Sequence, residues 1–201
     1  MAMKIDIAET NISASQMSEF YRLAALQGSH VDRVTFQAYL ERCNPFAFES
    51  VLALVNGNVQ FNAVDTHDPQ TFFQTRTGLW VSDEFRSWIL SKAKPVKKLA
   101  AAVGKSYDLT QDAYNREITP WLPKGYALDE SGACARIATM IQKQPNGGAG
   151  DLLNNGYSNL FYVAGYVVYV IWRAIRREWH IHTWRRGDDR WPVSSRVFSR
   201  N

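Results

Sequence analysis

The feature that most constrains the fold is an uncharged run near the C-terminus. Residues 160–172 (LFYVAGYVVYVIW) are thirteen residues without a charge, followed by Arg173, Arg176 and Arg177. A membrane-spanning helix needs about 20 apolar residues, so this run is too short to span. β-branched and aromatic residues dominate it, and Ala164-Gly165 in its middle is typical of a two-residue turn. The run therefore predicts two paired strands and no membrane span.

The same pattern continues to the end of the chain. Strands are expected near 159–163, 167–173 and 178–185, with a further edge near 196–198. Upstream, Ser82 is a good N-cap for one helix, and Asp129 or Ser131 for another. The predicted fold class is α+β, with a helical N-terminal portion followed by a C-terminal antiparallel β-meander.

Three regions follow from these patterns. Residues 1–66 are expected to be helical or mixed, and residues 67–148 mainly helical with a Lys-rich connector at 92–105. Residues 149–201 are expected to form a Trp- and Arg-rich antiparallel β unit. The alternative is that all three regions form one compact domain.

Composition excludes several classes of protein. The chain is 46% hydrophobic and 21% charged, which is typical of a globular protein and not of a disordered one. Its two cysteines, Cys43 and Cys134, are far apart, which excludes a disulfide scaffold or a Cys-rich zinc site. The first residues contain no apolar segment typical of a secretory signal, so a cytoplasmic location is expected. Since no phosphate-binding loop, GxSxG or HExxH motif occurs, the sequence predicts no cofactor and no catalytic residue.

Arginine and tryptophan alternate in the C-terminal region. Residues 157–201 contain eight arginines, no lysine and three acidic residues, a net charge of +5. Arginine binds phosphate through two hydrogen bonds and aromatic rings stack on bases, so the pattern suits a nucleic-acid surface. A protein-binding surface and plain packing of arginine over tryptophan are the alternatives. The candidate binding residues are Trp172, Arg176, Arg177, Trp184, Arg185, Arg186 and Arg190.

A second candidate site is the pair His180 and His182. In a strand, residues two apart share a face, so these imidazoles would lie together with Trp184, and Trp179 and Ile181 would lie opposite. Two such histidines can bind zinc or iron. The alternative is a polar stripe on the sheet, or stacking between histidine and tryptophan.

Several segments resemble small uncharacterised proteins predicted from Parcubacteria-type candidate-phylum genomes. The segments are FFQTRTGLWVSDEF (72–85), KAKPV (92–96), DLTQD (108–112), LLNNGYSNLFYV (152–163) and RVFSR (196–200). The resemblance covers about residues 68–201, and it implies no activity, cofactor or site residue.

These observations rank three functions. The first is a small non-enzymatic binding protein that contacts a protein partner through its C-terminal Trp- and Arg-rich sheet. The alternative is a nucleic-acid-binding protein that uses the same sheet. The second alternative is a metal-dependent enzyme with His180 and His182 at its centre. The sequence does not indicate an oligomeric state.

Overall fold

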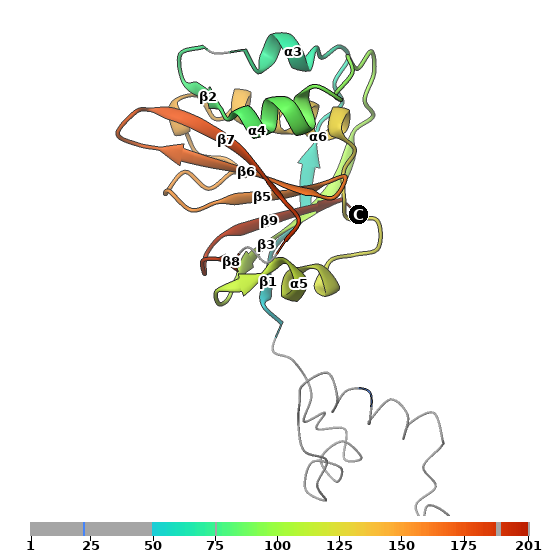
Figure 1. Ribbon diagram of the computed structural model, residues 1–201, viewed down its shortest axis with the longest axis vertical. Helices are drawn as coiled ribbons and strands as arrows, with labels where there is room; N and C mark the ends of the chain where they lie inside the picture. The colour runs from blue at the N-terminus through green and yellow to red at the C-terminus, as the bar shows by residue number, and fades with distance from the viewer. Residues whose placement is uncertain (1–21, 23–49, 75, 188–189, 201) are drawn as a thin grey trace, which may run out of the picture. The chain divides into compact units, whose positions relative to one another are not determined.

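The computed structural model describes residues 22, 50–74, 76–187 and 190–200 (Figure 1). Residues from Ser50 onward form one compact unit. The part of the helical or mixed region 1–66 that precedes Ser50 lies outside the described residues, apart from Arg22. The account below therefore concerns the unit that begins at Ser50.

A mixed sheet of seven strands organises this unit (Figure 1). Its strands are β1 (Leu52–Phe61), β2 (Leu79–Val81), β3 (Ala102–Leu109), β5 (Asn159–Val163), β6 (Tyr166–Arg173), β7 (Glu178–Arg185) and β9 (Arg196–Arg200). They lie in the order β1-β3-β9-β5-β6-β7-β2. Two short strands, β4 (Ala113–Tyr114) and β8 (Arg190–Trp191), pair separately.

The predicted antiparallel meander is wrong. β5, β6 and β7 are consecutive antiparallel strands at the expected positions, joined by the predicted turn at Ala164-Gly165. However, β9 lies beside β5 in parallel and beside β3 in antiparallel orientation, and β2 adds to β7 in parallel. Strand periodicity shows where a strand forms but not which distant strand it pairs with. The sheet therefore extends well outside the C-terminal region.

The helical part of the prediction is also corrected. Residues 67–148 contain three strands and only short helices apart from α6 (Glu130–Lys143). The short ones are α3 (Pro69–Phe72), α4 (Asp83–Phe85), the π-helical turn η2 (Arg86–Leu90), α5 (Asn115–Ile118), η3 (Thr119–Trp121) and η4 (Pro145–Gly147). The predicted caps are confirmed, since the Ser82 hydroxyl accepts from the Phe85 N–H and Asp129 accepts from the Gly132 N–H. Caps identify where a helix begins, but not how far packing lets it continue.

Residues 56–58 (NGN) have the composition of a turn, but they lie within β1. The pairing of β1 with β3 shifts register between Leu54 and Asn56 and again between Asn56 and Val59. A bulge absorbs extra residues without ending the strand.

The two faces of the sheet are covered differently. Helices α3, α4 and α6 lie over one face, the covered face, and bury residues such as Phe85, Ile137 and Trp179 against it (Figure 1). On the other face, a smaller core around Leu160 and Tyr162 packs beneath α5 and the β4–β8 pair. We call this second face the open face, because Trp80 of β2 and Trp184 of β7 remain exposed there. No helix in the described part of the chain is long and apolar enough to cross a membrane.

Candidate functional site

Alternation along β7 separates its side chains as predicted. Trp179 and Ile181 are buried beneath the helices, and His180 and His182 lie on the open face. Neighbouring strands then bring further rings to these histidines: Trp80 of β2 is the register partner of His180, and Tyr169 of β6 that of His182. We call the resulting row the aromatic strip; it consists of Trp80, His180, His182, Tyr169, Trp184 and Trp191.

The rings of the aromatic strip contact one another closely. The centroids of Trp80 and His180 are 4.9 Å apart in a stacked arrangement, and those of Tyr169 and His182 are 4.8 Å apart with an interplanar angle of 6°. Stacking between histidine and tryptophan, one of the predicted alternatives, is therefore present. Most of the strip is buried or half-buried, but Trp80 is 38% exposed and Trp184 43% exposed. The strip thus offers two accessible indole rings on a rigid base.

The two histidines differ in their electrostatic surroundings. His180 Nε2 lies 2.8 Å from Glu178 Oε1, so that carboxylate already has a partner within the sheet. Burial, then the neighbouring His180 and Arg173, lower the pKa of His182 to about 4, against a smaller opposing effect of Glu84. The His182 ring is therefore neutral at pH 7.

The histidine pair does not gather a metal-binding group. Within residues 50–74, 76–187 and 190–200, no three His, Cys, Asp or Glu side chains come together closely enough to hold a metal ion. Structural zinc sites use four ligands and catalytic sites at least three from the protein. The geometry therefore gives no support to the metal-dependent enzyme.

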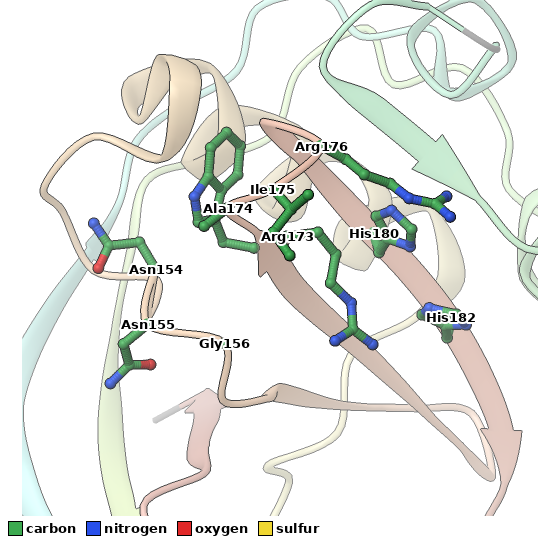
Figure 2. A pocket seen from close by; sticks show the side chains of 10 residues that line it. Asn154, Asn155, Gly156, Arg173, Ala174, Ile175, Arg176, His180 and His182 are labelled. Carbon is green, nitrogen blue, oxygen red and sulfur yellow. The ribbon is translucent and has the colours of Figure 1, made fainter.

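A groove lies beside the aromatic strip and shares His180 and His182 with it (Figure 2). Its volume is about 650 Å³. One wall is the segment 154–156 that precedes β5, and another is the turn between β6 and β7. Its lining consists of Asn154, Asn155, Gly156, Trp172, Arg173, Ala174, Ile175, Arg176, His180 and His182. This lining contains two arginines and no carboxylate.

Two buried side-chain amides fix the chain around residues 154–156, which form one wall of the groove. Gln144 donates from Nε2 to the carbonyl oxygens of Gly148 and Leu152 and accepts from the Leu152 N–H. Asn159 accepts from the Leu153 N–H and donates to the Leu153 and Val170 carbonyl oxygens. Because both amides are fully satisfied and about 1% exposed or less, the wall is built on the core and is well defined.

The arginines of the groove are accessible to a ligand. Arg173 is exposed, and its guanidinium makes no ion pair or hydrogen bond with another described residue. Figure 2 shows its side chain reaching into the space between Gly156 and His182. Arg176 is also exposed and lies 3.8 Å from Glu178, a weak surface pair. The groove therefore carries positive charge that the described residues neutralise only in part.

The predicted binding residues are scattered around this site. Trp184 belongs to the strip and Arg176 to the groove, whereas Trp172 is 6% exposed and packs against Trp179 on the covered face, reaching the groove only in part. Arg177 lies in the β6–β7 turn with φ 55°.

The other three arginines lie outside the groove and contact the protein itself. Arg185 lies over Trp88, Arg186 over Tyr126 and Tyr162, and Arg190 pairs with Asp112. Arginine stacked on an aromatic ring is ordinary surface packing. These contacts leave the three side chains less free than Arg173.

Sequence reasoning missed Trp80, Tyr169 and Arg173. The strand period places Arg173 on the same face as Tyr169, so it could have been found from β6 alone. Trp80 could not, because it reaches the histidines only through the parallel pairing of β2 with β7. No protein-family model, curated protein or solved structure matches this chain, so the function is inferred from the site itself.

Proposed function

We propose that this chain is a non-enzymatic binding protein that binds single-stranded nucleic acid along the groove and the aromatic strip. The observation that carries the proposal is Arg173, an exposed guanidinium with no partner among the described residues. It lies in a groove whose lining contains no carboxylate and shares His180 and His182 with the aromatic strip. Cationic grooves flanked by aromatic platforms are the usual means of holding a single strand without catalysis.

Phosphate groups would contact the arginines at the β6–β7 turn. A guanidinium offers a planar fork of donors that matches phosphate, and within the described part of the chain Arg173 uses none of its donors. Glu178, the register partner of Arg173, lies 2.8 Å from His180. Repulsion of a phosphate by this carboxylate is therefore reduced.

Bases would stack on the exposed indoles. Trp80 and Trp184 are each supported from behind by other rings of the strip, Trp80 by both histidines and Trp184 by Tyr169 and Trp191. A ring that is already held in place loses little conformational freedom when a base stacks on it. Such stacking contributes about 1–3 kcal/mol per base.

The protein partner expected first from the sequence is the second candidate. Three of the four C-terminal tryptophans, Trp172, Trp179 and Trp191, are at most 6% exposed, which limits the apolar area available to a stable interface of about 800 Å² per partner. The observation in favour of a protein is Ile175, which is fully exposed at the tip of the β6–β7 turn and lines the groove.

Fluorescence anisotropy with labelled single-stranded oligonucleotides of about 12 nucleotides tests the proposal on the full chain. We expect salt-sensitive binding, weakened about tenfold by Arg173→Gln, with a salt slope lower by about one. Trp184→Ala should weaken binding about tenfold without changing the salt slope, since it removes stacking only. Arg190→Gln is the matched control, because Arg190 pairs with Asp112 outside the groove lining.

Absence of binding at about 50 mM salt would overturn the nucleic-acid proposal, as would equal effects of Arg173→Gln and Arg190→Gln. A protein ligand whose binding is abolished by Ile175→Asp, with no oligonucleotide binding, would establish the second candidate instead.

A further inference from the structure

A second cationic feature lies away from the groove, in the middle of helix α6. Arg136 is only 7% exposed, and its guanidinium lies over the Phe61 ring of β1 at 4.7 Å. Its Nε and Nη1 atoms are buried and have no hydrogen-bond partner among the residues that the structure describes. Arg136 thus combines a buried charge with two unused donors.

A buried guanidinium with unsatisfied donors destabilises the folded state unless a hydrogen-bond acceptor binds to it. A buried charged donor without an acceptor loses its hydration and receives nothing in return. Arginine cannot avoid this cost by releasing its proton, because its pKa lies far above neutrality. In native structures a buried guanidinium is usually paired with an anion. An anion is therefore expected to bind to Arg136.

The neighbouring Arg200 adds a second positive charge near Arg136. Burial, and then this charge, lower the pKa of the Arg136 guanidinium, which stays protonated as arginine does in proteins. Asp129 acts in the opposite direction, but its carboxylate caps α6 by accepting from the Gly132 N–H. No carboxylate in the described ranges therefore pairs with Arg136.

A small hollow opens beside Arg136, between α6 and the end of β1. Its volume is about 10 Å³, which is room for a single oxygen atom of water size. The hollow is lined by Gln60, Phe61, Asn62, Arg136, Thr139, Met140 and Lys143. Gln60, Asn62 and Lys143 are exposed, so amide and ammonium donors surround its mouth.

We propose that this hollow is a binding site for a phosphate group, either inorganic phosphate or a phosphate monoester. One phosphate oxygen enters the hollow and accepts from Arg136, while the remaining oxygens stay at the mouth within the reach of Lys143 and the two amides. A water molecule could accept the same hydrogen bonds, but it would leave the charges of Arg136, Lys143 and Arg200 uncompensated. The site is on the covered face and does not depend on the proposed function.

Thermal unfolding of the full chain in phosphate and in chloride at matched ionic strength tests the proposal. A ligand that binds only the folded state raises the unfolding temperature with its concentration. We expect this rise with inorganic phosphate, confirmed by isothermal titration calorimetry, and its loss in Arg136→Met. Phosphoserine provides the monoester arm: a rise with either compound supports the site and identifies which source it accepts.

Two further variants keep the test decisive if Arg136→Met does not fold. Lys143→Met changes an exposed residue and should weaken phosphate binding at least fivefold, whereas Lys124→Met, also exposed but away from the hollow, should leave it unchanged. Arg173→Gln in the nucleic-acid groove should leave it unchanged as well, which separates the two sites. Equal unfolding temperatures in phosphate and chloride, or an equal phosphate effect in Lys143→Met and wild type, would show that only water fills the hollow.

Discussion

Both faces of strand β7 carry a tryptophan, but one of these side chains is buried and the other is exposed. Trp179 is 1% exposed beneath the helices, and its indole N–H donates to the Gln144 carbonyl oxygen at 3.2 Å. Trp184, five residues later, is 43% exposed on the open face, and among the described rings it contacts only Tyr169 and Trp191. An aromatic-rich strand is therefore not in itself a binding surface. What matters is which rings another layer covers.

Packing on the covered face also positions the chain that forms the wall of the groove. Trp172 packs against Trp179 at 5.2 Å, and Gly147 lies so close to Trp172 that a Cβ there would meet the indole at 2.3 Å. This contact fixes the chain that leads from α6 towards the wall of the groove. The groove is consequently supported from the covered face of the sheet.

Replacing the two tryptophans of β7 gives the sharpest comparison of the faces. Trp179→Ala should reduce the free energy of unfolding by about 3–5 kcal/mol, because it leaves a cavity and removes the buried hydrogen bond from the indole N–H to the Gln144 carbonyl. Trp184→Ala should reduce the free energy of unfolding by only about 1 kcal/mol, because it removes only the ring contacts of a side chain that is already exposed. Urea denaturation measures both, and similar costs would mean that the open face is as well packed as the covered one.

Asn159→Ala tests whether the covered core supports the groove. It removes three hydrogen bonds to Leu153 and Val170 and should reduce the free energy of unfolding by about 3 kcal/mol. Hydrogen exchange at the Leu153 amide should become faster as well. Asn154→Ala is the control: it removes one exposed bond to the Gly147 carbonyl and should cost less than about 1 kcal/mol. Unchanged exchange at Leu153 in Asn159→Ala would separate the groove wall from the core.

The smallest expected effect concerns His182 and pH. Its folded-state pKa of about 4 lies below the unfolded value of about 6.5, so as the pH falls the unfolded chain binds the proton first. Wild type should therefore lose about 2 kcal/mol of stability between pH 6.5 and 4, after allowance for partial solvent screening. His182→Gln removes this contribution, and urea denaturation across this pH range should show a shallower dependence. Equal pH dependence in both proteins would mean that the ring is solvated like an exposed one.

Local pattern was sufficient for part of the candidate site. The alternation of Glu178 to Trp184 placed His180 and His182 on one face, and the structure confirms it. The same reasoning could not place Arg185, Arg186 and Arg190, because their contacts with Trp88, Tyr126 and Asp112 come from segments far away in the chain. A basic composition therefore overstated the number of arginines that remain free for a ligand.

The sequence by itself determined where the C-terminal strands lie, where α6 begins and which side chains of β7 share a face, since these depend on period, caps and turns within a few residues. Only the tertiary structure decided the order of the sheet, the parallel pairing that brings Trp80 to His180, and the groove around Arg173. These depend on pairing between segments up to about a hundred residues apart, as with Trp80 and His180. Backbone hydrogen bonds between strands are the same for every sequence, so the burial of the whole chain, and not any local pattern, selects the partners.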